Sequence, residues 1–250
     1  MKPTFLNHEK ALLTVMVQAD NPDRIKSLID LSLPEGAEAF GMQFEQMLPE
    51  FRTPHVYKKL FSYAKEKPVY VTNYRHGKNE GKTDTQLAEE LLEIASCGAT
   101  LCDVMGDYYD KQPGEMTYEE HAVKKQMDLI EQLHKIGAEV LMSSHVCQFT
   151  PVDKVLEIAL AHQKRGADIS KIVTNADTME QQMENLRIIH LLKETLNIPF
   201  LFLCGGECHI LRRIGGNLGC CMYLCVHEHD AFATPVQPLL KNVKAIRDNL

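Results

Sequence analysis

The chain has 250 residues, 44% of them hydrophobic, and a formal net charge of −7 at pH 7. A chain of this length can bury a full core, and it matches the roughly 250 residues typical of a (β/α)8 barrel. The negative charge argues against a general nucleic-acid binder or a membrane-surface protein. The first residues lack the apolar run of a signal peptide, and no apolar stretch approaches the roughly 18 residues of a membrane span. We therefore expect a cytoplasmic protein.

Short apolar runs recur along the chain, rich in branched or aromatic residues and of a length that suits buried parallel strands. We predict eight strands, at residues 12–17, 37–44, 68–73, 100–105, 139–145, 168–173, 199–204 and 220–226. Helical patterns lie between them. They include a helix starting at Asn21-Pro22-Asp23, others at residues 82–96, 118–136, 150–166 and 177–196, and a last one from Pro235 to the C-terminus.

Strict alternation of strands and helices implies a parallel sheet with helical crossovers. Eight repeats favour closure into one (β/α)8 barrel (TIM barrel) that spans residues 1–250 as a single domain. Gly98, Gly137 and Gly166 each stand between a predicted helix and the next strand, as expected for helix C-caps. An open Rossmann-like sheet is the alternative, but no GxGxxG motif follows an early strand.

The sixth predicted strand has a lysine at its centre. Because strand side chains alternate between faces, Lys171 shares a face with Ile169 and Val173. Burial lowers the pKa of an ammonium group, and a neutral lysine amine attacks carbonyl groups, as Schiff-base chemistry requires. His145 ends the neighbouring strand and could transfer protons beside this amine. The alternatives are a surface lysine and a structural histidine.

Other polar residues also fall at the predicted carboxyl ends of the strands, which form the active-site face of such a barrel. They include Arg75, Glu80, Asp103, Arg213 and Gln237. For Arg75, Glu80 and Arg213 the alternative is a solvated surface charge. This pattern indicates one polar site at that end of the barrel.

Eight cysteines occur in the chain, and we expect free thiols rather than a disulfide framework. A zinc site is an alternative, because Cys and His residues, which are the usual zinc ligands, gather near the C-terminus at Cys204, Cys208, His209, His227 and His229. The Cys-x3-Cys spacing is not one of the tight zinc-ribbon spacings, so we favour a protein without a metal.

These motifs together resemble the type I 3-dehydroquinate dehydratase family of Schiff-base (β/α)8 lyases, over essentially the whole chain. The resemblance is most specific in Leu141-Met142-Ser143-Ser144-His145 and in Gly166-Ala167-Asp168-Ile169-Ser170-Lys171-Ile172. Glu80-Gly81, Arg213, and Pro235 with Gln237 support it. The resemblance implies dehydration of 3-dehydroquinate or a related cyclic keto acid, within the shikimate pathway of aromatic amino acid biosynthesis.

The resemblance also implies roles for residues. Lys171 would form the imine, His145 would act as general acid and base, and Glu80 would orient His145. Arg213 would hold the substrate carboxylate. The further substrate contacts would be Gln43, Arg75, Asp103 and Gln237. No organic cofactor or metal is implied, because the imine is the electron sink; the partner is a small keto acid, and the chain is expected to form a homodimer.

The chain also departs from the family pattern. Gly41 and Met105 stand where the family has carboxylates, and Val146 and Ala233 depart from the residues usual beside the histidine and in the closing loop. Gly and Met cannot accept hydrogen bonds from substrate hydroxyls, so we expect 3-dehydroquinate to be a poor substrate unless Gln43, Asp103 or His227 replace those contacts. Two alternatives remain. One is a Schiff-base enzyme that dehydrates or cleaves a carbon–carbon bond in another keto acid. The other is a non-catalytic barrel used as a binding module.

Overall fold

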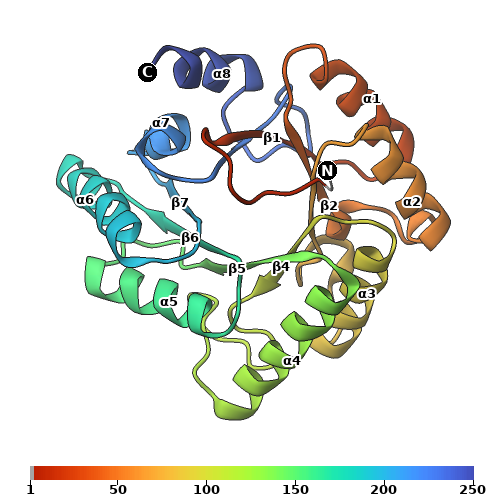
Figure 1. Cartoon of the computed structure of the whole chain (residues 1–250), viewed down its shortest axis with the longest axis horizontal. Coiled ribbons are helices and arrows are strands. Elements are labelled where there is room, and N and C mark those ends of the chain that lie inside the picture. The colour runs from red at the N-terminus through yellow and green to blue at the C-terminus, as the bar shows by residue number, and fades with distance from the viewer. Residues whose placement is uncertain (1–2) are drawn as a thin grey trace.

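The computed structural model describes residues 3–250, as a ring of parallel strands enclosed by helices (Figure 1). The strands are β1 Leu12–Val17, β2 Ala39–Gln43, β3 Val69–Thr72, β4 Leu101–Met105, β5 Glu139–His145, β6 Ile169–Asn175, β7 Phe200–Gly205 and β8 Met222–Cys225. The helices are α1 Pro22–Ser32, α2 Pro54–Tyr63, α3 Asp84–Ser96, α4 Glu120–Ile136, α5 Val152–Lys164, α6 Met179–Thr195, α7 Leu211–Leu218 and α8 Leu240–Asn249. Three 3-10 turns follow β2 and β3, namely η1 Phe44–Gln46, η2 Pro49–Phe51 and η3 Gly77–Asn79.

The strand order confirms the predicted (β/α)8 barrel. From β1 to β7 each strand pairs in parallel with the next one in sequence, and β8 pairs with β1, which gives the order β7-β6-β5-β4-β3-β2-β1-β8. Between β7 and β8 the backbone N–H of Cys221 donates to the carbonyl of Phe200 at 2.9 Å. This bond draws the two ends of the sheet together, so the ring is nearly closed.

Glycines end the helices where the sequence predicts them. Gly98, Gly137 and Gly166 have φ angles of 119°, 89° and 98°, in the left-handed region that favours glycine. Each one turns the chain from α3, α4 or α5 into the following strand. The three junctions therefore have a local cause in the sequence.

The prediction that the last helix begins at Pro235 was wrong, because α8 begins at Leu240. Residues 235–237 instead form a turn, and Leu239 lies beside the end of β8, where it forms a parallel bridge with Val226. The backbone N–H of Val226 donates to the carbonyl of Pro238 at 2.9 Å. These backbone bonds hold residues 238–239 beside the barrel mouth, and the helix begins directly after them.

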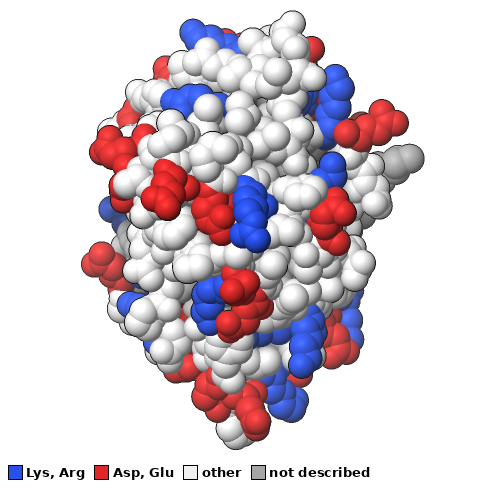
Figure 2. Space-filling model, turned by 90° about the vertical axis from the view of Figure 1, so that its left-hand side faces the viewer, with Lys and Arg blue, Asp and Glu red and all other residues white. Residues whose placement is uncertain are grey.

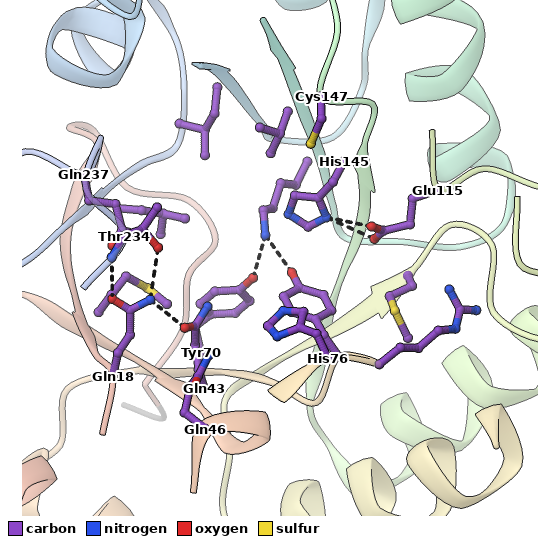
Figure 3. A pocket seen from close by; sticks show the side chains of 18 of the residues that line it. Gln18, Gln43, Gln46, Tyr70, His76, Glu115, His145, Cys147, Thr234 and Gln237 are labelled. Atoms are coloured by element: carbon purple, nitrogen blue, oxygen red, sulfur yellow. Dashed lines mark hydrogen bonds and ion pairs between the residues drawn. The ribbon is translucent and has the colours of Figure 1, made fainter. Parts of the chain in front are cut away.

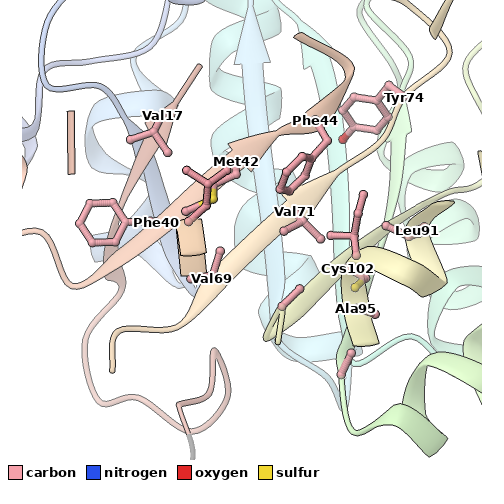
Figure 4. Packing of buried hydrophobic residues seen from close by; sticks show 14 of the residues in the cluster. Val17, Phe40, Met42, Phe44, Val69, Val71, Tyr74, Leu91, Ala95 and Cys102 are labelled. Carbon is pink, nitrogen blue, oxygen red and sulfur yellow. The ribbon is translucent and has the colours of Figure 1, made fainter. Parts of the chain in front are cut away.

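Alternate residues of each strand enter two different apolar layers. Figure 4 shows part of the outer layer, a cluster that includes Met42 of β2, Val69 and Val71 of β3, and Leu91 and Ala95 of α3. The inner layer fills the barrel and includes Leu101, Leu141, Ile169 and Leu201. All four side chains are buried, and the large cavity of the described residues opens at the other end of the strands.

The outside of the barrel carries charges of both signs. Figure 2 shows acidic and basic side chains interspersed among uncharged ones on the face over α5 and α6. No helix among residues 3–250 is long and apolar enough to cross a membrane.

Candidate active site at the carboxyl ends of the strands

A cavity of about 570 Å³ opens at the carboxyl ends of the strands. Of the predicted site residues, Lys171, His145, Arg75, Gln43 and Gln237 line it. Glu80, Asp103 and Arg213 do not. The wall also contains residues that the sequence did not single out, of which Tyr70, Tyr74, Glu115 and Arg212 matter most for the chemistry.

Lys171 lies at the floor of this cavity and is 4% exposed. Its Nζ donates to the hydroxyl of Tyr74 at 2.8 Å and to that of Tyr70 at 3.1 Å. It also lies 3.2 Å from Oδ2 of Asp103. The buried lysine predicted from its apolar strand neighbours is present, but its amine is surrounded by polar groups from β3 and β4.

Asp103 is the buried counter-ion of this amine. Both tyrosine hydroxyls donate to its Oδ2, and Ser143 donates to its Oδ1 at 2.5 Å. Burial alone would raise the pKa of this carboxyl, but Lys171 and the three hydroxyl donors outweigh it and hold the pKa below its usual value. Its side chain has no exposed surface and does not line the cavity, although the resemblance implied a contact with the substrate.

His145, at the end of β5, pairs with a glutamate from the loop after β4. Its Nδ1 lies 2.9 Å from Oε2 and 3.1 Å from Oε1 of Glu115. In Figure 3 the imidazole lies between Glu115 and the cavity, with its other nitrogen turned toward the open space. A carboxylate on Nδ1 fixes the proton there and leaves Nε2 as a base.

Glu80 does not make the contact with His145 that the resemblance implied. It follows the 3-10 turn η3, and its side chain is exposed at the surface. Glu115 makes the contact with His145 that was expected of Glu80. Its backbone φ of 54° is unusual for a residue other than glycine. Ser144 donates to the Glu115 carbonyl at 2.7 Å and so holds this strained backbone in place. Nothing in the local sequence distinguishes Glu115 from any other loop acid.

Of the two arginines on α7, Arg212 lines the cavity, and Arg213, which was expected to hold the substrate carboxylate, does not. Both lie on α7, where successive side chains point about 100° apart, so only one of them can face the barrel. Arg212 is 9% exposed, and its Nε donates to the carbonyl of Cys204 at 2.8 Å. Burial lowers its pKa, and no carboxylate among residues 3–250 forms an ion pair with it. Arg213 is exposed.

Arg75 lines the cavity, but two carboxylates already hold its guanidinium. Nε lies 2.7 Å from Asp84 and Nη1 lies 2.6 Å from Asp107. Burial opposes its charge, yet these two partners raise its pKa overall. Any contact between Arg75 and a substrate must therefore compete with both carboxylates.

Amide side chains cover the side of the cavity opposite His145 (Figure 3). Gln18 donates to Gln43 at 2.5 Å and to the hydroxyl of Thr234 at 3.2 Å, and it accepts from the Thr234 backbone at 3.3 Å. These bonds tie the segment after β8 to the barrel rim. Gln237 on that segment is 6% exposed, and its Oε1 has no hydrogen-bond partner among the described residues.

Two remaining sequence-based ideas concern His227 and the cysteines. His227 does not enter the main cavity; it lies 3.1 Å from Glu35. All eight cysteines have free thiols. Within residues 3–250, no group of three or more His, Cys, Asp or Glu side chains is arranged to hold a metal ion.

The fold and the cavity define a single-domain (β/α)8 barrel with a polar site at the carboxyl ends of its strands. The family model of type I 3-dehydroquinase matches residues 14–247, and the chain belongs to that family. The family is one of hydro-lyases, so the protein is an enzyme of the lyase class.

Named proteins and solved structures agree with this membership. A 3-dehydroquinate dehydratase of Lactiplantibacillus plantarum is 24% identical over 243 residues, which cover 95% of this chain and 85% of that protein. Another, of Alkaliphilus oremlandii, is 35% identical over 92 residues, or 36% of each chain. The structure of the enzyme from Geobacillus kaustophilus superimposes with a TM-score of 0.82 at 14% identity, and covers 97% of this chain and 91% of that one. The type I enzyme of Clostridium difficile gives 0.80 at 14% identity, with coverages of 97% and 93%.

Proposed function

We propose that the protein dehydrates 3-dehydroquinate or a closely related cyclic keto acid through an imine on Lys171. The observation that carries the proposal is the floor of the cavity. A buried lysine amine, 4% exposed, lies there on β6, and a histidine paired with a carboxylate ends the adjacent strand β5. The two groups supply covalent capture of a ketone and transfer of the neighbouring proton.

The reaction follows from these groups. Lys171 condenses with the ketone and releases water, and the iminium withdraws electrons from the adjacent carbon. Nε2 of His145 removes a proton from that carbon, which gives an enamine. The enamine expels the hydroxyl group one carbon further on, and the protonated imidazole supplies the proton with which it leaves as water. Glu115 holds the imidazole and stabilises its positive charge during these transfers.

Arg212 is proposed to bind the substrate carboxylate. A buried guanidinium without a carboxylate partner is costly, and an anionic ligand would compensate for this. Gln237, with its unpartnered Oε1, would accept a hydrogen bond from a substrate hydroxyl. Gln43 and Arg75 remain proposed contacts at the rim, whereas Asp103 is assigned to the lysine.

The cavity wall near Gly41 limits which substrate hydroxyls the protein can bind. A Cβ atom at Gly41 would lie 2.2 Å from Sδ of Met16, so Met16 fills the space that a longer side chain would need. Of the three groups expected to compensate, Asp103 already accepts hydrogen bonds inside the protein and does not line the cavity, and His227 lies elsewhere. Only Gln43 lines the cavity. The small number of hydrogen-bond acceptors in the cavity wall near Gly41 therefore favours, as further substrates in addition to dehydroquinate, related cyclic keto acids that carry fewer hydroxyl groups.

Borohydride trapping tests the proposal. The protein is incubated with 3-dehydroquinate, and in parallel with less hydroxylated cyclic keto acids, then reduced and mapped by peptide mass spectrometry. We expect a stable adduct on Lys171 and on no other lysine, and none in Lys171→Met. A substrate that is turned over without an adduct on Lys171 would overturn the mechanism. Turnover of dehydroquinate with kcat/KM of about 10⁴ M⁻¹s⁻¹ or more, with no better substrate in the panel, would show that the sequence departures are neutral.

We further propose that the enzyme is a cytoplasmic homodimer, as its family resemblance implies. Two large apolar side chains on α6, Met179 and Met183, are 64% and 58% exposed, which suits a contact between subunits. Light scattering coupled to gel filtration measures the mass in solution. A mass of one chain, 28.3 kDa, at micromolar concentration would contradict the dimer.

A further inference from the structure

The hydrogen bonds around Lys171 join the amine, two phenols and one carboxylate into a closed network. Nζ donates to Tyr70, Tyr74 and Asp103, and both phenols donate to the same carboxylate oxygen, Oδ2 of Asp103. The amine is thus joined to Asp103 directly and also through each hydroxyl. Such a network can move a proton along more than one route without any large motion.

Imine formation needs this kind of transfer. An ammonium that becomes an iminium loses two protons, and the ketone oxygen gains two and leaves as water. Nitrogen and oxygen are bonded to the same carbon in the intermediate, so the protons cannot pass directly between them with good hydrogen-bond geometry. A group that touches the nitrogen and also reaches the oxygen has to carry them.

Tyr74 is the better placed of the two phenols. Both phenols line the cavity, but Tyr74 lies just beyond the carboxyl end of β3 and is 7% exposed, whereas Tyr70 lies deeper, near the start of β3, and is fully buried. The Tyr74 ring also packs edge-on against the ring of His145, with centroids 5.3 Å apart. A ketone that enters from the mouth therefore places its oxygen nearer to Tyr74.

We infer that Tyr74 is a catalytic residue of imine formation, and that it relays protons between the Lys171 amine and the substrate ketone oxygen with Asp103 as the proton store. The inference rests on the proposed Schiff-base function. Asp103 takes one proton from the ammonium, and the freed amine attacks the ketone carbon, whose oxygen takes the Tyr74 proton. Tyr74 is reprotonated from Asp103. The second nitrogen proton follows the same path, the C–O bond breaks, and water leaves with both protons.

The surrounding groups leave this role to Tyr74. His145 is hydrogen-bonded to Glu115 and is proposed to remove the proton from the carbon next to the imine. The guanidinium of Arg75 is bound to two carboxylates. The phenols stay neutral, since burial and the Asp103 charge raise the pKa of Tyr74 and of Tyr70 well above 10. A neutral hydroxyl can donate and accept at once, as a relay requires. Tyr70 is then a positioning residue that orients Asp103.

Timed borohydride quenching under single-turnover conditions measures imine formation separately from turnover. The full-length wild type is compared with Tyr74→Phe, Tyr70→Phe and a control, Tyr57→Phe, which removes the hydroxyl of a buried tyrosine on α2 outside the cavity. We expect Y74F to slow the appearance of the Lys171 adduct by about 10²-fold while reaching the same final amount, within the range for general acid–base catalysis. Y70F is expected to slow it less than tenfold, and Y57F should match the wild type.

A more acidic phenol provides a second measurement if Y74F folds poorly. Fluorotyrosine placed at residue 74 keeps the shape of the ring and should change the pH dependence of adduct formation, which a purely structural role would not move. The same residue at position 57 should leave it unchanged. Adduct formation in Y74F at the wild-type rate, or an unaltered pH profile with fluorotyrosine at residue 74, would overturn the relay. Absence of any Lys171 adduct in the wild type would instead refute the proposed function.

Discussion

The pairing of His145 with Glu115 rather than Glu80 gives the sharpest prediction. Glu115→Gln keeps an oxygen beside Nδ1 of His145, 2.9 Å away in the native protein, but removes the charge. A hydrogen bond to a charged group is worth about 1.5–3 kcal/mol and a neutral one about 0.5–1.5 kcal/mol. The imidazolium formed during the reaction therefore loses about 1–1.5 kcal/mol of stabilisation, which corresponds to roughly five- to tenfold in kcat.

Alanine at the same position removes the orienting contact as well, and we expect a loss of about 10²-fold. The matched control is Glu80→Gln, which makes the same chemical change at an exposed site and should leave kcat unaltered. The assay is the initial rate at saturating substrate, followed by absorbance of the conjugated product. Wild-type activity in E115Q together with a tenfold loss in E80Q would refute the assignment and restore Glu80 as the partner of His145.

Three further predictions concern other residues. His145→Ala should lose roughly 10²–10⁴-fold in turnover yet still form the trapped Lys171 adduct; an unchanged rate would remove His145 from the mechanism. Arg212→Ala should raise KM by at least tenfold, because about 1.5–3 kcal/mol of charge-assisted binding is lost. Arg213→Ala is the control and should leave KM unchanged. A raised KM in Arg213→Ala but not in Arg212→Ala would contradict the role of Arg212. Glu45 is fully buried, and burial raises the pKa of its carboxyl from 4.5 to about 7. Because the folded state retains a proton that the unfolded state has lost, stability should fall as pH rises from 4.5 to 7, by about 3 kcal/mol at 1.36 kcal/mol per pKa unit. Urea unfolding measures this, and the free energy of unfolding of Glu45→Gln should not fall over this pH range. Identical pH profiles for the wild type and Glu45→Gln would contradict the prediction, because they would mean that folding does not change the pKa of Glu45.

The sequence by itself determined the barrel. Strand and helix periods are local properties of the chain, and glycines such as Gly137 mark the helix ends through backbone sterics alone. Consecutive βαβ units then have few ways to assemble, and parallel pairing of β5 with β6 follows. For the same reason Lys171 and His145 could be placed on adjacent strands without a structure.

Only the tertiary structure decided which partners surround them. Glu115 lies in a loop whose path depends on contacts with β5, and the choice between Arg212 and Arg213 depends on how α7 is rotated against the barrel. Tyr74 reaches Lys171 across 97 residues of sequence. Loop paths, helix rotation and contacts across the barrel arise from packing among distant segments, so no local pattern in the sequence encodes them.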